Sequence, residues 1–265
     1  MKSGKKWLAG ILSIVMTMSF MPMNAFAGEA TSDSADTDAV WTVEDNEGFV
    51  LGNYNELQDA MSCGRDYETT IILNRDASGK GATLALSDGD NSYLNFDFNG
   101  NTYTITDGAT CGDGSERAGI CLQGDEGHAT FKNGTLKIQN CEVGIYINGD
   151  YSSDAKITNF NIDASGCSDC ANAVIADQIA INGNSSVKVQ PGNNAIKFWS
   201  SSTIDTTGTI QGKIVNKDEE DYYFLRIYNG LFTEKPKDEY IANGYTVKTG
   251  TDGTFSVIPT EEWAP

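Results

Sequence analysis

Altered copies of the stretch VGIYING, residues 143–149, recur along the chain and indicate how it folds. It combines a short strand, in which apolar residues alternate with others, and an Asn-Gly turn. Related units are AGICLQG at 118–124, NAVIADQ at 172–178, NAIKFWS at 194–200 and FLRIYNG at 224–230. A period of 22 to 29 residues with several short strands in each repeat is typical of a solenoid.

Alignment of these units predicts two columns of inward-facing apolar residues. The first column is Ile120, Ile145, Val174, Ile196 and Leu225, and the second is Leu122, Ile147, Ala176, Phe198 and Ile227. Each unit also contains a second predicted strand, at 129–138, 155–164, 179–189 and 202–214. Strands of successive coils would stack about 4.8 Å apart in parallel sheets. A leucine-rich repeat has a similar period, but its leucine consensus is missing. We therefore predict an all-β chain that folds as a parallel β-helix.

Both ends of such a solenoid need a cover, because they expose strand edges. At the N-terminal end, Leu57, Ala60 and Met61 share a helical face within 54–64, just before the first repeat strand at 69–74. The N-terminal cap is thus expected at about 41–68. At the C-terminal end, 240–259 is expected to form a hairpin within a cap at about 231–259.

Asn-Gly pairs begin at Asn99, Asn133 and Asn182 within the repeats, and Asn159 lies at a similar position of its own repeat. Asparagine tolerates left-handed backbone conformations. We expect these residues to form turns and their amides to bond from coil to coil as a ladder.

The first 27 residues are typical of a secretory signal peptide. Three lysines precede an apolar run at 7–23, and AFA at 25–27 offers small residues for cleavage after Ala27. The rival interpretation is a membrane anchor, but Pro22 interrupts the apolar run. We predict a secreted, extracellular protein, with association at the cell surface left open, and no membrane insertion. Residues 28–40 are acidic and predict a disordered spacer, and 41–265 a single β-helix domain.

The predicted mature chain is strongly acidic. Removal of Lys2, Lys5 and Lys6 takes the net charge from −19 to −22. Such a surface repels nucleic acids and anionic membranes, which excludes both as partners. We expect a monomer.

Three stretches resemble a known family: YNELQDAMSCGRDYETTIILNRDAS at 54–78, LNFDFNGNTYTI at 94–105 and YIANGYTVKTGTDGTFSV at 240–257. They are similar to right-handed parallel β-helix proteins with a pectate-lyase-like fold that Gram-positive gut bacteria secrete or display. The resemblance implies a right-handed β-helix and an extracellular location. The family is mostly uncharacterised and is presumed to include adhesins and glycan-associated proteins.

Six cysteines remain after the predicted cleavage: Cys63, Cys111, Cys121, Cys141, Cys167 and Cys170. Cys141 and Cys170 each lie three residues before equivalent positions of successive coils, close enough for a bridge. We predict the disulfide Cys141–Cys170, with the tight Cys167–Cys170 loop as the alternative. A catalytic CxxC motif would open a helix, whereas CSDC lies in a predicted turn.

Outward-facing residues of the aligned strands predict a ligand site. Inward Ile145 and Ile147 turn Tyr146 outward, and the same alternation exposes Lys197, Trp199, Arg226 and Tyr228. Exposed aromatic rings can stack on sugars, and the two cations can hold an acidic substituent. We predict a shallow glycan or peptide site centred on Trp199, on a module that binds a glycan or a host or bacterial surface protein.

The predicted outward columns offer little catalytic chemistry. Glycoside hydrolysis needs two carboxylates, and Asp177 is the single acid in these columns. His128 is expected to lie solvated in a turn at 124–130. We therefore predict a non-catalytic, adhesin-like or glycan-binding module. The alternative is a polysaccharide lyase or glycoside hydrolase that acts on acidic glycans.

Calcium is the ion for which the sequence offers candidate ligands. Asp88 and Asp90 lie in one predicted turn, and Asp150 and Asp154 lie in another, so each turn has carboxylate oxygens at short spacing. Neither turn matches an established calcium loop. No other cofactor is predicted.

Overall fold

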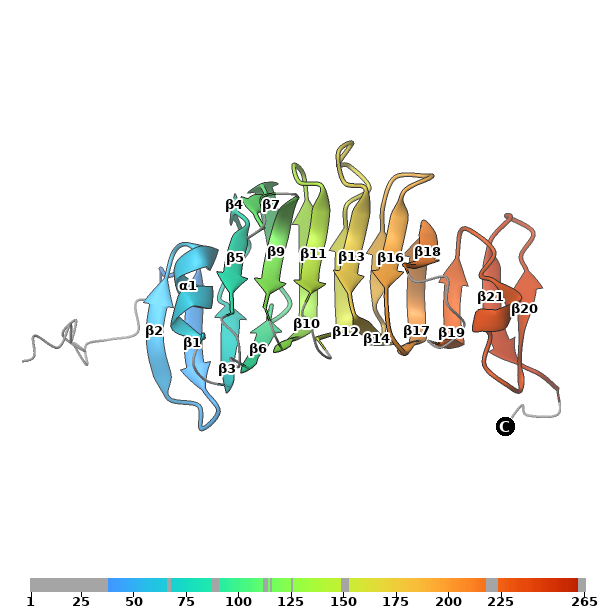
Figure 1. Cartoon of the computed structure of the whole chain (residues 1–265), viewed down its shortest axis with the longest axis horizontal. Helices are drawn as coiled ribbons and strands as arrows, with labels where there is room; N and C mark the ends of the chain where they lie inside the picture. The colour runs from blue at the N-terminus through green and yellow to red at the C-terminus, as the bar shows by residue number, and fades with distance from the viewer. Residues whose placement is uncertain are drawn as a thin grey trace, which may run out of the picture. The chain divides into compact units, whose positions relative to one another are not determined.

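The computed structural model describes residues 38–65, 68–86, 91–111, 114, 116–124, 126–148, 153–217 and 224–261. They belong to one compact unit. The predicted signal peptide and nearly all of the predicted spacer lie outside the described residues. The unit is a parallel β-solenoid of about six turns, as predicted from the repeats. Figure 1 shows its strands stacked side by side from the N-terminal to the C-terminal end.

Two sheets make up the solenoid, and we call them sheet A and sheet B. Sheet A has 14 strands: β1 (Trp41–Asp45), β2 (Val50–Tyr54), β3 (Glu68–Leu73), β4 (Ala77–Lys80), β6 (Asn91–Asp97), β7 (Thr102–Asp107), β10 (Glu126–Ile138), β12 (Asp154–Asp163), β14 (Gln178–Gly183), β15 (Ser186–Lys188), β17 (Ser202–Gln211), β19 (Leu225–Phe232), β20 (Tyr245–Thr249) and β21 (Phe255–Pro259). Sheet B has seven: β5 (Ala82–Ala85), β8 (Ala109–Thr110), β9 (Arg117–Gln123), β11 (Val143–Asn148), β13 (Asn172–Ala176), β16 (Asn194–Phe198) and β18 (Lys213–Asn216).

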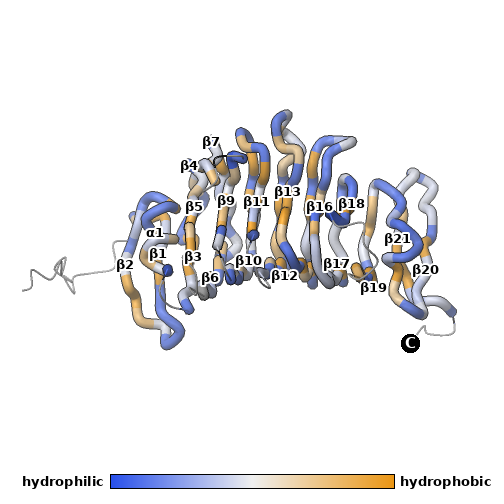
Figure 2. Tube along the Cα trace, in the orientation of Figure 1, coloured by the Kyte–Doolittle hydropathy of each residue, from blue (hydrophilic) through white to orange (hydrophobic). Residues whose placement is uncertain are grey.

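The first four members of each predicted column are confirmed. Ile145 of β11 pairs with Ile120 of β9 and with Val174 of β13, and Val174 pairs with Ile196 of β16. These residues are fully buried in the core. Figure 2 shows the apolar and polar residues that alternate along the stacked strands.

The fifth member of each column was assigned to the wrong sheet. Ile196 pairs with Ile214 of β18, not with Leu225. β19, which contains Leu225 and Ile227, pairs with β17 in sheet A instead. The reason is that alternation has the same period in both sheets, so it does not reveal to which sheet a strand belongs.

Stacked aromatic rings fill part of the core beneath sheet A. Phe96 and Phe131 lie parallel with centroids 4.9 Å apart, and Phe98 and Phe160 meet edge to face at 4.6 Å. All four are fully buried. Burial of such large side chains at successive coil positions stabilises the stack.

The predicted asparagine turns are present. Asn99, Asn133 and Asn159 have left-handed φ angles of 50°, 57° and 51°, and in the next coil Gly183, rather than Asn182, takes this role with 66°. The predicted ladder of asparagine amides does not run along them. Instead, Asn133 donates to Asp97, and Asn159 accepts from the backbone N–H of Asn184.

The predicted helix and C-terminal hairpin are also confirmed. Helix α1 (Leu57–Cys63) buries Leu57, Ala60 and Met61, and β20 pairs with β21 in an antiparallel hairpin. The sequence analysis missed the antiparallel pair β1–β2 at the other end and the short 3-10 helix η1 (Asp238–Tyr240). No helix in the described part of the chain is both long and apolar enough to cross a membrane.

Candidate functional site on the outer face of sheet A

The structure divides the predicted ligand site between two sheets. Tyr146 lies in β11 and Lys197 in β16, and Trp199 directly follows β16, so these three belong to sheet B. Arg226 and Tyr228 lie in β19 of sheet A. The structure therefore does not bring the five residues together on one sheet, because β19 joins sheet A rather than sheet B.

On sheet B, the two predicted aromatic residues are partly buried. Tyr146 and Trp199 pack against a second apolar cluster that lies apart from the main core and consists of Cys111, Ala118, Cys121, Val143 and Ile175. The Lys217 ammonium lies 4.4 Å from the centroid of the Trp199 ring. These contacts give both aromatic side chains a structural role in holding the cluster.

Sheet A presents two regular rows of side chains to the outside. The first row is Glu68, Tyr93, His128, Asp154 and Gln178, and the second is Thr70, Asn95, Thr130, Lys156, Ala180, Thr203 and Arg226. Each row follows from the parallel register, so its members occupy equivalent positions of successive coils. We call these two rows, with Tyr228 of β19 and with Phe224 directly before β19, the outer face of sheet A.

His128 is the centre of a polar network on this face. It lies in β10 and not in the turn that the sequence predicted. Its Nδ1–H donates to Oδ1 of Asp154 on the next coil, and Oδ2 of Asp154 lies 3.1 Å from Nζ of Lys156. The Tyr93 ring stacks on the imidazole, with centroids 4.5 Å apart and planes 10° apart. Because Nδ1 is engaged, Nε2 is the ring nitrogen that remains for a ligand.

Two lysines at this end of sheet A are paired with acids. Lys156 is paired with Asp154, and Lys132 lies 3.2 Å from Asp97, which also accepts from Asn133. Pairing cancels most of the field of each cation. The face therefore offers many hydrogen-bonding groups without a concentrated positive charge.

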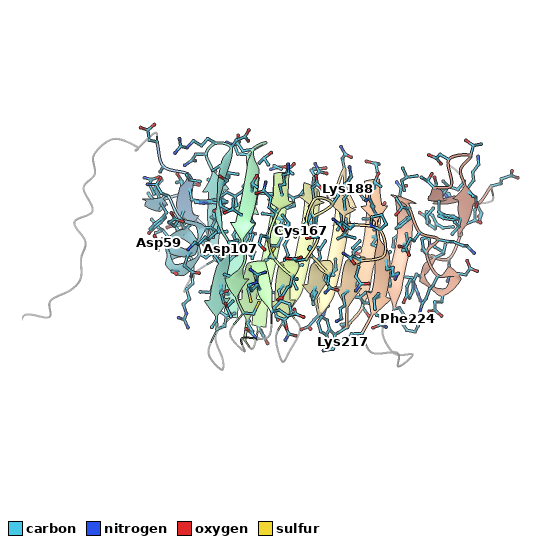
Figure 3. The ribbon with its side chains drawn as sticks, turned by 90° about the horizontal axis from the view of Figure 1, so that it is seen from above. Asp59, Asp107, Cys167, Lys188, Lys217 and Phe224 are labelled. Atoms are coloured by element: carbon cyan, nitrogen blue, oxygen red, sulfur yellow. The ribbon has the colours of Figure 1, made fainter. Side chains whose placement is uncertain are left out.

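Three aromatic side chains on this face are strongly exposed. Tyr93 is 45% exposed, Tyr228 is 37% exposed, and Phe224, directly before β19, is 53% exposed. The Arg226 guanidinium lies 4.7 Å from the centroid of the Phe224 ring. Figure 3 shows Phe224 near the C-terminal end of the stack. Within the described residues, Phe49 is the other aromatic exposed to this degree, so the outer face of sheet A holds three of four.

Metal binding finds no support among the described residues. None of their His, Cys, Asp and Glu side chains form a group of three or more that could hold an ion. Asp88, Asp90 and Asp150 lie outside the described residues. Asp154 is engaged with His128 and Lys156. The calcium sites stay a prediction.

The six cysteines are free thiols in the structure, so the predicted Cys141–Cys170 bridge is not formed there. The Cys167 thiol donates to the carbonyl oxygen of Cys141 at 3.4 Å, and the Cys170 thiol donates to that of Asn172 at 3.2 Å. Burial, with Cys167 nearby, raises the pKa of Cys170 to about 12. In Figure 3, Cys167 lies in the middle of the stack.

The sequence held a signal for the pair at the centre of the site. The predicted strands 129–138 and 155–164 align on Ala129 and Ala155, which pair in the structure. The residues directly before them are His128 and Asp154, so the same alignment already implied that these two are neighbours.

The fold and this face place the chain in the class of parallel β-solenoids with a polar and aromatic outer sheet face. Comparison of the chain with family models, curated proteins and solved structures finds no match.

Proposed function

We propose that the chain is a secreted recognition module that binds a neutral linear polysaccharide along the outer face of sheet A. The observation that carries the proposal is the exposed Tyr93 ring, stacked on His128 in a row that continues through Asp154. Flat aromatic surfaces beside fixed hydrogen-bonding groups match a sugar, which has apolar C–H faces and hydroxyl edges.

The polar side chains of the two rows supply the complementary groups for hydroxyls. Nζ of Lys156 donates, the amides of Asn95 and Gln178 both donate and accept, and Nε2 of His128 is the ring nitrogen that remains for a hydroxyl. The rows run along the stack of strands, from β3 to β14 and beyond. An extended polymer can contact several successive coils, whereas a single sugar contacts one or two.

Charge favours a neutral ligand over an acidic one. The chain after the predicted cleavage carries −22, and Lys132 and Lys156 are already paired with acids. A polyanionic glycan would meet repulsion that a neutral glycan avoids. The signal-peptide pattern of residues 1–27 supports export of the chain to the outside of the cell, where such polymers are found.

A second candidate function is acid–base catalysis on the bound glycan. The specific observation in its favour is the hydrogen bond between His128 and Asp154, which orients an imidazole as in many general bases. Against it, the carboxylate that is observed beside His128, that of Asp154, is also held by Lys156. Recognition without catalysis is therefore the function that we favour.

The experiment is a screen of the chain without residues 1–27 by affinity electrophoresis in gels that contain xylan, glucomannan, mixed-linkage β-glucan, polygalacturonate or alginate. The proposal predicts retardation by at least one neutral polymer and none by the two acidic ones. Retardation by acidic polymers alone, or by none, would contradict it. Product release that is lost in His128→Gln while retardation persists would establish the catalytic alternative instead.

A further inference from the structure

An apolar column of sheet B ends at an isoleucine that the core covers only in part. Four members of the column are fully buried: Ile120, Ile145, Val174 and Ile196. Ile214 of β18 pairs with Ile196 and is the next member, but it is only partly buried. β18 is also the last strand of sheet B in the described part of the chain.

A cavity lies against the end of this column. Its volume is about 150 Å³, and its apolar walls are Ile214 and Val215 on one side and Pro236 and Tyr240 on the other. Pro236 and Tyr240 are themselves buried, and the Tyr240 ring packs edge to face on Phe198 with centroids 6.2 Å apart. The far wall is therefore part of the packed fold.

The size of the cavity and its apolar walls suit one small ring. An engineered apolar cavity of roughly 150 Å³ in another protein binds benzene. Sites for drug-sized molecules are larger, usually roughly 300–1,000 Å³. A ring in this cavity would remove apolar surface of Ile214 from water together with its own. The cavity therefore favours a ligand with one compact apolar body.

Charged side chains give the same cavity a positive lining. Lys213, Lys235 and Lys237 contribute to it, together with Glu234. Three lysines and one glutamate give these residues a net charge of +2, whereas the chain after the predicted cleavage carries −22. The sign of the local charge is thus opposite to that of the protein as a whole, and it favours an anion.

The ion pairs of two of these lysines lie outside the cavity. Lys235 pairs with Asp238 at 2.8 Å, and Lys237 pairs with Glu239 at 3.3 Å. Neither acid belongs to the described residues that line the cavity, and both are strongly exposed. Exposed pairs of this kind are weak, so an anion in the cavity can compete for the two ammonium groups. Lys213 lines the cavity from the opposite wall.

We propose that this cavity binds a small carboxylate with a compact apolar body, of about the size of benzoate. The ring packs between Ile214 and Pro236, and the carboxylate is held by the lysines. An inorganic anion would leave the apolar walls uncovered, and an uncharged ring would lack the attraction of the lysines. The site shares no residue with the outer face of sheet A, so the proposal is independent of polysaccharide binding.

The test is a titration of the isotopically labelled chain without residues 1–27, followed at the amide resonances of Ile214, Val215 and Tyr240. The probes are benzoate, its uncharged isostere benzamide, and acetate, which has the carboxylate without the ring. Benzoate should give saturable shifts at millimolar concentration. Benzamide and acetate should each bind at least about fivefold more weakly, because each lacks one part of the interaction.

Two variants separate the charged part of the site from the apolar part. Lys213→Glu/Lys235→Glu should weaken benzoate binding at least about fivefold, as expected when two exposed ion pairs are replaced by repulsion. Val215→Phe should also weaken it, at unchanged net charge, because the larger side chain fills the cavity. The matched control is Lys137→Glu/Lys188→Glu, which makes the same charge change at exposed lysines of sheet A and should retain wild-type affinity.

Several results would overturn the proposal. These are equal affinity for benzoate and benzamide, equal losses in the double variant and its control, or no shift of the three amides at millimolar benzoate. Wild-type affinity in a folded Val215→Phe variant would also overturn it, because the ligand would then lie elsewhere. Thermal unfolding shows whether each variant is folded, and the comparison of the three probes on the wild-type chain needs no variant.

Discussion

His128 in β10 and Asp154 in β12 are directly paired across two successive coils, and a hydrogen bond joins their side chains. Both side chains are largely covered, with 19% and 16% of their surfaces exposed. Two residues 26 positions apart thus form one unit, which a parallel register creates by stacking equivalent positions.

Loss of this hydrogen bond should cost stability as well as binding. We expect Asp154→Asn to lower the free energy of unfolding by about 1–2 kcal/mol, because it removes a charge-assisted bond and leaves Lys156 without its carboxylate. Urea denaturation measures the change. Asp205→Asn, an exposed change on β17, is the control and should change stability by less than about 0.5 kcal/mol. Equal losses in the two variants would contradict the account of the pair.

The left-handed turn at Asn99 makes a different prediction about the fold. Its φ of 50° suits glycine and asparagine but strains a residue with an ordinary side chain. Asn99→Gly should therefore keep nearly the wild-type stability, whereas Asn99→Ala should lose about 1 kcal/mol. Thermal unfolding of the two variants under the same conditions measures the difference. An alanine variant as stable as the glycine variant would refute the claim that this turn strains an ordinary residue.

Trp199 should act on stability rather than on ligand binding. It packs with Tyr146 against the apolar cluster of sheet B, so Trp199→Ala should remove buried contacts and lower the free energy of unfolding by about 2–4 kcal/mol. Polysaccharide retardation of the folded variant should be unchanged. A variant of wild-type stability that no longer binds would restore the site originally expected around Trp199.

The buried thiols predict how stability depends on pH. Burial raises the pKa of Cys170 from 9.0 to about 12 and raises that of Cys141 as well, so the folded state favours the protonated thiols. Their contribution is fully present below pH 9 and is lost as the pH rises from 9 towards 12, because the unfolded chain then releases protons that the folded chain keeps. Urea denaturation between pH 8 and 11 should show falling stability that Cys141→Ser/Cys170→Ser attenuates.

The predicted Cys141–Cys170 bridge would change this result, because a disulfide does not titrate. Peptide mapping of the protein purified without reductant determines which form is present. A bridged Cys141–Cys170 peptide would confirm the sequence prediction, and it should accompany a loss of the pH dependence. Free thiols at all six positions would refute the bridge.

Much of the fold was readable from the sequence because inward residues such as Ile145 and Ile196 repeat at equivalent positions, and columns of this kind occur in few folds. The assignment of Leu225 and Ile227 failed for a physical reason. Alternation fixes which side chains point inward, but the length of the intervening chain decides which sheet a strand joins. In sheet B, the strand that pairs with β16 is β18, and β19 pairs with β17 in sheet A.

The candidate site was harder to predict than the fold. Tyr93, His128 and Asp154 come from three separate coils, and each of them alone is an ordinary surface residue. Their meaning depends on the register of the second strand in each repeat, which the sequence analysis aligned but did not use for polar residues. The exposure of each side chain was also not predictable, since the sequence contains no sign that Trp199 is partly buried while Phe224 is 53% exposed.

The most direct test of the account is the dissociation constant of Tyr93→Ala for a neutral polysaccharide that retards the wild-type protein, measured by isothermal titration calorimetry. Phe49→Ala is the matched control, because Phe49 is 67% exposed and lies outside the outer face of sheet A. Loss of one stacking ring should weaken binding at least about fivefold in Tyr93→Ala, on the scale of an aromatic contact of roughly 1 kcal/mol, and leave Phe49→Ala unchanged. Wild-type affinity in a folded Tyr93→Ala variant would contradict the central claim that this face is the binding site.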